Sequence, residues 1–386
     1  MGKQRHTARR LTATSAFALL LGWFQPTLAV EPINIGFTTD FSGVTASLTM
    51  VEAPVVEMVV KEVNAAGGIN GRPIKLIVQD NASDPAKAIG NVKMFKEEYH
   101  TPAIIAGVTS SVNLALKNWA EKNHVSIISA DPQSDALWDK SGKSWLFRTA
   151  PPASVLVDAT LARLKQLGYT KVAFEGSTLA WGTDTLSTIK ATAGAYGITI
   201  VASVLAEPKT KDLTIQAKQL KDSGAEALIC AEYEAETVVL ARAMNSVGWK
   251  PHVIHTSPAN INASIGLSSA EMYEGWETVA TADSTKPLVG KIWAKTEAYM
   301  GKKIDHDEKA IRQYDAIMLL VDALKASGNP DDPTAIRDAY YKLDNYERAL
   351  GKVGGKGGFA IGRNSIITPD DVVIYDLKAG NMVAVK

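Results

Sequence analysis

Two serines follow a short apolar run, at a place where the chain can hold an anion. Ser110 and Ser111 come after the run 103–107, which predicts a buried strand, and open the amphipathic segment 111–123, which predicts a helix. The first turn of a helix has free backbone N–H groups, and its dipole favours negative charge. With the hydroxyls, this turn can bind a carboxylate, although Ser110 can equally serve only to cap the helix. We take Ser110 and Ser111 as candidate ligand contacts.

The sequence shows no set of residues arranged for catalysis or metal binding. It lacks the GxSxG turn of hydrolases, the HExxH helix of zinc proteases and a Walker phosphate loop. The one cysteine, Cys230, lies in the apolar run 227–231, which predicts a buried strand thiol. His252 and His255 are three residues apart on a predicted strand, so they face opposite sides. We therefore expect a protein that is not an enzyme and uses no metal and no cofactor.

Residues 1–29 have the features of a removable secretory leader. Four basic residues precede the apolar segment 16–24, and Ala29 ends a stretch suited to cleavage. The apolar segment is shorter than the roughly 20 residues that a membrane span needs. We expect cleavage near Ala29 and release of a soluble protein into the periplasm.

The charge balance and the length of the chain indicate its partners and its number of domains. The chain has 41 basic and 41 acidic residues; the leader holds four of the basic and none of the acidic ones, so 37 face 41 beyond it. This slightly negative balance favours neither nucleic acid nor an anionic membrane as partner. About 357 residues remain after the leader, which is more than one ordinary core holds and predicts two domains. We expect a monomer.

Short apolar runs alternate with helix-length segments along nearly the whole chain. Such runs are typical of parallel strands buried on both faces, and their alternation with helices predicts doubly wound α/β sheets. Expected strands are 33–37, 74–79, 103–107, 125–129, 146–149, 172–174, 199–203, 227–231, 253–256, 278–282 and 372–375. Expected helices are 52–65, 85–98, 111–123, 154–167, 184–196, 213–223, 235–247, 288–300, 311–326 and 334–343.

The alternation falls into two successive sets separated by Pro151-Pro152. After about residue 280 the helices resume without a full set of strands, and the glycine-rich passage 351–359 precedes the last one. A chain that crosses between lobes more than once explains this order. We expect one lobe made of residues 30–150 plus about 281–350, and another made of 151–280 plus about 351–386.

Several short motifs occur along the chain in a fixed order. They are Ile35-Gly36-Phe37 leading to Phe41-Ser42-Gly43, the turn Gly67–Pro73, Asp80 with Asp84-Pro85, Ala106–Ser111, Gly248-Trp249 and Tyr314-Asp315-Ala316. Their order and spacing resemble the leucine/isoleucine/valine-binding family of periplasmic solute-binding proteins, which serve ABC importers. The resemblance covers essentially the whole mature chain. It implies two α/β lobes joined by three crossovers, a ligand in the cleft between them, and the membrane permease of an importer as partner.

The resemblance also implies ligand contacts on further loops. Ser110 matches the loop that binds the ligand carboxylate in the family. Asp131 and Gln133 stand where the family has a small residue and a threonine, and Asp131 can pair with a ligand ammonium or be only a turn residue. Trp181 and Tyr233 stand at positions of family aromatics that cover the ligand.

Ser257 marks the clearest departure from the family pattern. The acidic residue that holds the ligand ammonium in the family falls near this position, which carries no carboxylate. A buried ammonium without an anionic partner is costly, so either Asp131 or Glu234 replaces it, or the ligand has no ammonium. We expect a small carboxylate-bearing solute, either a branched-chain or other hydrophobic amino acid or a related organic acid. Aromatic acids or amides without an ammonium, and a sensory ligand-binding role, are the alternatives.

Overall fold

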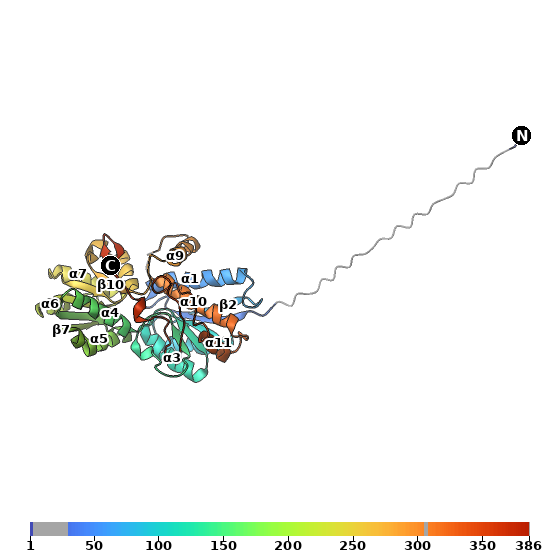
Figure 1. Ribbon diagram of the computed structural model, residues 1–386, viewed down its shortest axis with the longest axis horizontal. Coiled ribbons are helices and arrows are strands. Elements are labelled where there is room, and N and C mark those ends of the chain that lie inside the picture. Colours follow the sequence, from blue (N-terminus) through green and yellow to red (C-terminus); the bar gives the residue numbers. More distant parts are fainter. Residues whose placement is uncertain (3–29, 305–307, 386) are drawn as a thin grey trace. The chain divides into compact units, whose positions relative to one another are not determined.

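The structure is a computed structural model that describes residues 1–2, 30–304 and 308–385. Most of the expected leader, residues 3–29, therefore lies outside the described residues. From Glu31 onward the chain forms one compact unit with two sheets and helices packed on them (Figure 1). In the parts of the chain that the structure describes, no helix has the length and apolar character needed to cross a bilayer.

The first sheet is wholly parallel, with the strand order β2-β1-β3-β4-β5. Its strands are β1 (Ile33–Thr39), β2 (Ile74–Asp80), β3 (Ala103–Ala106), β4 (Ser126–Ser129) and β5 (Leu146–Arg148). We call this sheet with its helices the first lobe.

The second sheet has the order β12-β11-β10-β9-β8-β6-β7; the pairs β10-β11 and β11-β12 are antiparallel, and the other pairs of described strands are parallel. Its strands are β6 (Lys171–Ser177), β7 (Thr199–Ala206), β8 (Ala227–Ala231), β9 (His252–His255), β10 (Glu277–Ala280), β11 (Val373–Lys378) and β12 (Asn381–Ala384). We call this sheet with its helices the second lobe, and Figure 1 shows α4, α5, α6 and α7 gathered around it.

The α-helices are α1 (Ala46–Ala65), α2 (Pro85–Glu97), α3 (Ser110–Asn123), α4 (Ala153–Gln166), α5 (Ala180–Thr192), α6 (Thr214–Asp222), α7 (Glu234–Ser246), α8 (Pro258–Leu267), α9 (Pro287–Met300), α10 (Lys309–Ala326) and α11 (Pro333–Tyr340). Short 3₁₀ turns are η1 (Asp135–Leu137), η2 (Ala193–Tyr196), η3 (Ala270–Tyr273) and η4 (Pro369–Asp371). The two doubly wound parallel lobes agree with the fold class expected from the sequence.

Local sequence explains how the first crossover is built. Asn70 and Gly71 have φ values of 52° and 85°, which this tight turn requires, and the flanking Ile69 and Arg72 exchange backbone hydrogen bonds of 2.8 and 3.0 Å. Farther along, the Asp84 side chain accepts hydrogen bonds from two backbone N–H groups at the start of α2. The turn at Gly67–Pro73 is therefore confirmed, and the Asp84 cap explains why α2 begins at Pro85.

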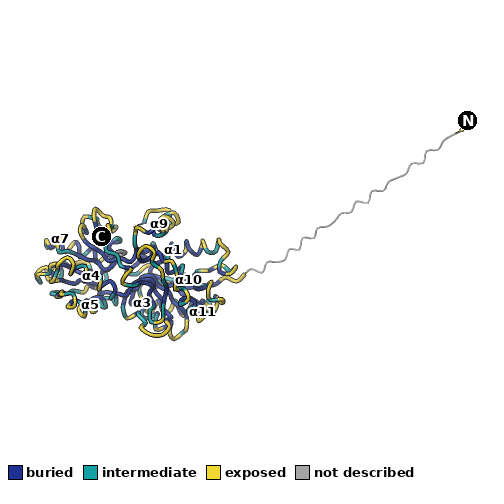
Figure 2. Tube along the Cα trace, viewed as in Figure 1, coloured by how far each residue is buried: buried dark blue, intermediate teal, exposed yellow. Residues whose placement is uncertain are grey.

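The hydrophobic core of the first lobe joins distant parts of the chain. Buried residues of β1 and α1 pack with those of α10 and α11, so that Ile35 and Val56 share one cluster with Leu320 and Ile336. The second lobe has its own clusters around β6, β8 and β9. Figure 2 shows the buried strands between helices whose outer faces are exposed. The exact residue boundaries of the two lobes stay a prediction.

Several elements differ from the expectation. Helix α1 begins at Ala46 and α5 at Ala180, earlier than expected, while α8 and β12 were not expected. Strand β12 pairs with β11 through a hairpin at Ala379 and Gly380, whose φ values are 50° and 76°. Helix α8 has a proline in its first turn and little amphipathic character, so hydrophobic periodicity gives no signal for it.

Candidate functional site

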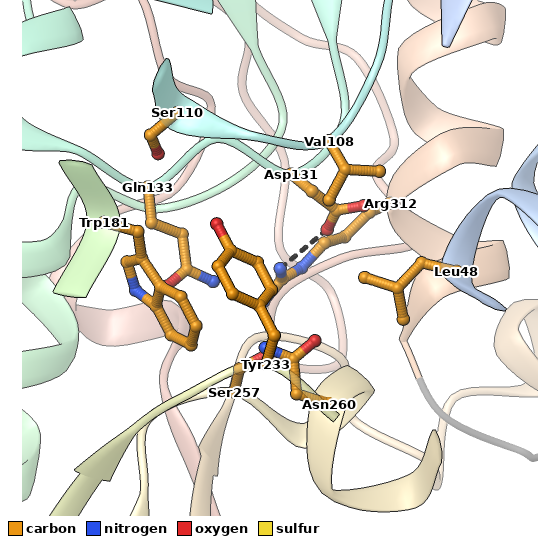
Figure 3. Close-up of a pocket in the computed structure, with 10 residues that line it drawn as sticks. All are labelled: Leu48, Val108, Ser110, Asp131, Gln133, Trp181, Tyr233, Ser257, Asn260 and Arg312. Carbon is orange, nitrogen blue, oxygen red and sulfur yellow. Dashed lines mark hydrogen bonds and ion pairs between the residues drawn. The ribbon is translucent and has the colours of Figure 1, made fainter. Parts of the chain in front are cut away.

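A pocket lies where the carboxyl ends of strands from both lobes meet, which is the usual ligand position in doubly wound folds. Ten residues line it: Leu48, Val108, Ser110, Asp131, Gln133, Trp181, Tyr233, Ser257, Asn260 and Arg312 (Figure 3). The structure therefore brings together six of the seven site residues expected from the sequence. The seventh, Ser111, does not line the pocket. That these residues contact a ligand stays a prediction.

Ser110 is the first residue of α3, directly after the loop that follows β3. The N-cap residue, Thr109, makes no side-chain capping hydrogen bond, and its buried hydroxyl has no partner. The Ser110 hydroxyl oxygen accepts a hydrogen bond from the backbone N–H of Ser134 at 3.2 Å, which leaves its own proton free to donate. This turn can thus offer both a hydroxyl and free backbone N–H groups to a carboxylate.

Ser111 makes a hydrogen bond between the two lobes. Its hydroxyl oxygen accepts a hydrogen bond from the backbone N–H of Ala180, at the start of α5 in the second lobe, at 3.3 Å. The side chain therefore joins the two lobes beside the pocket rather than facing into it.

Trp181 and Tyr233 form the aromatic side of the pocket. Trp181 lies in the first turn of α5, and Tyr233 is the N-cap residue of α7. Their ring centroids are 5.3 Å apart at an interplanar angle of 66°, an edge-to-face arrangement. Both side chains are buried, and the indole N–H of Trp181 has no hydrogen-bond partner. The pair offers an apolar surface with one free donor.

Arg312 is the main feature of the pocket that sequence reasoning missed. Its Nη1 donates to Asp131 Oδ1 at 2.8 Å, its Nη2 pairs with Glu308, and the residue is 1% exposed. Because the guanidinium neutralises Asp131, the carboxylate of Asp131 no longer opposes binding of an anionic ligand. Within the described residues, Asp131 Oδ2 has no hydrogen-bond partner, so it remains available as an acceptor.

Two further carboxyl groups, Glu52 and Glu234, lie next to residues that line the pocket: Glu52 is beside Asp131, and Glu234 follows Tyr233 in the chain. Burial, with the neighbouring Asp131 as a second cause, raises the pKa of Glu52 on α1 well above its usual value. Burial also raises the pKa of Glu234, which accepts a hydrogen bond from Ser47. Glu234 does not line the pocket. The sequence offers Asp131 and Glu234 as partners for a ligand ammonium. Of these two residues, Asp131 is the one that lines the pocket.

Ser257 and Asn260 supply the floor from the start of α8. The backbone N–H of Ser257 donates to His255 Nδ1 at 3.0 Å, and burial lowers the pKa of His255 to about 4, so the imidazole is neutral near pH 7. Asn260, which the sequence reasoning also missed, donates from Nδ2 to the Glu232 carbonyl at 3.1 Å. Its Oδ1 is buried without a partner.

Side chains from the two lobes also meet directly around the pocket. Ser47 of α1 donates to Glu234 at the start of α7, and Ser134 donates to Asp184 of α5. The hydroxyl of Thr188 on α5 donates to Asp135 at 3.2 Å. The cavity volume open to the centres of water molecules is only about 20 Å³, room for about one water. A solute can enter only after these contacts separate or the lining side chains move.

The described part of the chain holds no cluster of three or more metal-ligating side chains. Cys230 is fully buried in β8, and burial raises the pKa of its thiol well above the usual value, which suppresses its nucleophilic form. Neither observation indicates catalytic chemistry at this pocket.

Comparisons with known proteins fit this architecture. The family model described as "periplasmic binding protein" matches residues 32–372. Leu/Ile/Val-binding protein homolog 3 of Brucella melitensis is 24% identical over 353 residues, covering 89% of this chain and 91% of that protein. Leu/Ile/Val-binding protein BraC3 of Rhizobium johnstonii is 24% identical over 389 residues, covering 98% and 99%.

Solved structures show the same fold. A periplasmic binding protein type 1 from Bordetella pertussis superposes with a TM-score of 0.82 at 19% identity, covering 92% of this chain and 99% of its own. The branched-chain amino acid transporter substrate-binding protein LivJ from Streptococcus pneumoniae, in complex with isoleucine, gives a TM-score of 0.79 at 20% identity, with coverage of 92% and 99%.

The fold and the pocket define a solute-binding protein of two α/β lobes. This chain belongs to the periplasmic binding protein family, whose model spans nearly all of it beyond the first 31 residues. The family consists of solute-binding proteins of transport systems rather than enzymes, in agreement with the expectation from the sequence.

Proposed function

We propose that this protein captures a small carboxylate-bearing solute of the amino-acid class and presents it to the membrane permease of an ABC importer. The observation that carries this proposal is the pocket itself, where six positions expected from the family pattern converge from both lobes. The names of the relatives and the isoleucine complex of the pneumococcal protein make branched-chain amino acids the first ligands to test, with related organic acids next.

The groups in the pocket divide between the two charged ends of an amino acid. The Ser110 hydroxyl and the first turn of α3 offer donors to a carboxylate. Asp131 Oδ2 offers a charged acceptor to an ammonium, which replaces the acidic residue missing at Ser257. Trp181 and Tyr233 cover the body of the ligand with aromatic surface. This assignment favours an amino acid over an acid without an ammonium.

Calorimetric titration of refolded mature protein with leucine, isoleucine and valine tests the proposal. Ser110→Ala removes a hydrogen bond to a charged group, which is worth about 1.5–3 kcal/mol, so the dissociation constant should rise at least tenfold by the usual conversion of about 1.4 kcal/mol per decade. Ser126→Ala is the matched control. Ser126 is the first residue of β4, whereas the pocket lies at the carboxyl ends of the strands, and the Ser126 hydroxyl contacts the Pro333 carbonyl. Equal affinity of both variants would show that the carboxylate site is misplaced.

The location and the partner belong to the same proposal. The family and the expected leader together support a periplasmic, monomeric receptor. Mass spectrometry of the protein from a periplasmic extract should give a chain that begins near Val30, and light scattering should give the mass of one chain. Uptake of labelled ligand by vesicles that carry the permease should require the protein; uptake that does not depend on it would contradict the transport role.

A further inference from the structure

The two ends of the pocket differ in their unpaired groups. In Figure 3, Ser110, Gln133 and Trp181 lie at one end, Asp131, Arg312 and Leu48 at the other, and Tyr233 between them. A ligand whose carboxylate is held at Ser110 therefore directs its opposite end toward Arg312. What this far end offers decides which solutes fit, and the question rests on the function proposed above.

The far end is more polar than a site for a branched aliphatic side chain would be. Arg312 uses its two Nη atoms on Asp131 and Glu308, while its buried Nε–H has no partner among the residues that the structure describes. Asn260 Oδ1 is likewise buried without a partner among the described residues. One charged donor and one neutral acceptor thus remain beyond Asp131 Oδ2, which an ammonium would take.

An isobutyl side chain placed here would leave all of these groups without a hydrogen-bond partner, which a buried site tolerates poorly. A second carboxylate would satisfy Arg312 but would face the amide oxygen of Asn260, and two acceptors cannot form a hydrogen bond with each other. A carboxamide presents an oxygen to the Arg312 donor and an NH₂ group to an amide oxygen. Its neutral charge also suits a guanidinium that already has two carboxylate partners.

We propose that Arg312 is a specificity-determining residue of this pocket, which selects a small carboxylate-bearing ligand that ends in a carboxamide. The guanidinium donates from Nε to the carbonyl oxygen of that group, and Asn260 Oδ1 accepts from its NH₂. The apolar part of the ligand between its two polar ends lies against Trp181 and Tyr233.

Near-isosteric ligands test this selection on the unaltered protein. Leucine, asparagine and aspartate share a backbone and differ only at the end of the side chain. The series 4-methylpentanoate, succinamate and succinate repeats the comparison without an ammonium. Titration calorimetry should give asparagine a dissociation constant at least about tenfold below those of leucine and aspartate, because sites built around hydrogen bonds reject analogues that lack them strongly. Within the second series, succinamate should bind most tightly.

Variants then assign the preference to Arg312. Arg312→Met should weaken asparagine binding about tenfold or more and leave leucine binding unchanged or stronger. A purely structural arginine would lower both affinities by the same factor. Arg348→Met is the matched control, because Arg348 is also buried and pairs with Asp371 at 2.9 Å away from the pocket lining; its asparagine-to-leucine ratio should equal that of the unaltered protein. If Arg312→Met does not fold, Asn260→Ala should reduce the same ratio.

The outcomes separate this inference from the proposed function. Tighter binding of leucine than of asparagine would overturn the inference and leave the amino-acid receptor in place. Tighter binding of aspartate would mean that the Arg312 end takes an anion, and this also overturns the proposed carboxamide preference. If no compound of either series or other branched-chain amino acid binds, the proposed function fails and the inference fails with it. Equal losses for both ligands in Arg312→Met would remove the role assigned to Arg312.

Discussion

The contact between Ser134 and Asp184 gives a direct test of how the two lobes close. Ser134 lies in the loop before η1 of the first lobe, and Asp184 lies on α5 of the second. The bond can exist only when the lobes meet, so it stabilises the closed arrangement and not an open one. Asp184→Ala should therefore shift the balance between the two arrangements without altering any residue that lines the pocket.

The size of this shift follows from the type of bond. A hydrogen bond to a charged group contributes about 1.5–3 kcal/mol, and because Asp184 is only half-buried we take the lower value of about 1.5 kcal/mol. That corresponds to about a tenfold fall in the closed-to-open ratio. A ligand that binds the closed form then shows a dissociation constant up to about tenfold higher, because apparent affinity scales with the fraction of competent protein.

Calorimetry and stopped-flow release measure the effect, and small-angle scattering should show a larger radius of gyration for the unliganded variant. Asp158→Ala is the matched control, since Asp158 lies on α4 of the same lobe and accepts a hydrogen bond from Tyr196 of that lobe at 3.4 Å. It removes the same charge without touching the first lobe. An Asp184→Ala protein with the affinity, release rate and radius of the control would refute the closure argument.

Three further predictions concern buried ionisable groups. Burial alone would raise the pKa of Glu277, but the hydrogen bonds from Arg163, with His252 Nε2 3.6 Å from the carboxylate, outweigh it and hold this pKa at about 2. Because the folded-state pKa is depressed, the stability that Glu277 contributes is full above about pH 4.5 and lost as the pH falls toward 2. Chemical denaturation should show that Arg163→Met destabilises the protein at pH 7 but much less at pH 2.5, and an equal effect at both would contradict the assignment. Burial raises the pKa of Glu175 to about 8, so the native state keeps a proton that the unfolded chain releases, and stability falls as pH rises from about 4.5 to 8; Glu175→Gln should melt at a higher temperature than the unaltered protein at pH 8, and a lower melting point would refute this. The buried Cys230 should not react with a thiol reagent in the native protein and should react fully in guanidinium; rapid labelling of native protein would show that β8 opens readily.

The sequence predicted the fold well because its strands are short apolar runs with clear boundaries. The segment around Ile104 and Ile105, for example, is apolar at every position and fully buried, as expected for a central parallel strand. Helix α8 was not predicted from the sequence because its apolar residues do not repeat at helical spacing. Asn260 and Ser264 hold it instead by donating to the carbonyls of Glu232 and Glu234, and such contacts leave no local pattern.

The site was predictable where the family pattern marks it and not elsewhere. Ser110, Trp181 and Tyr233 each follow a strand in their own lobe, so strand and loop spacing locates them. Arg312 could not be found in this way, because a charged residue on an amphipathic helix usually faces solvent. Its partner Asp131 lies 181 residues away in the sequence, and nothing local couples the two positions. Their shared burial emerges only when α10 packs beside β4.

The first lobe is completed by α10 and α11, which follow strands β6 to β10 of the second sheet in the chain. Its core includes Leu320 and Ile336. In the sequence, strands β6 to β10 of the second sheet lie between strands β1 and β3 and these two residues. Until α10 has been synthesised, the apolar faces of α1 and its neighbouring strands therefore stay exposed. Exposed apolar surface of this kind promotes aggregation. Any fragment that stops before α10 keeps that exposed surface permanently. The first lobe cannot be produced as a single contiguous piece, and a nonsense mutation late in the reading frame should be nearly as damaging as an early one.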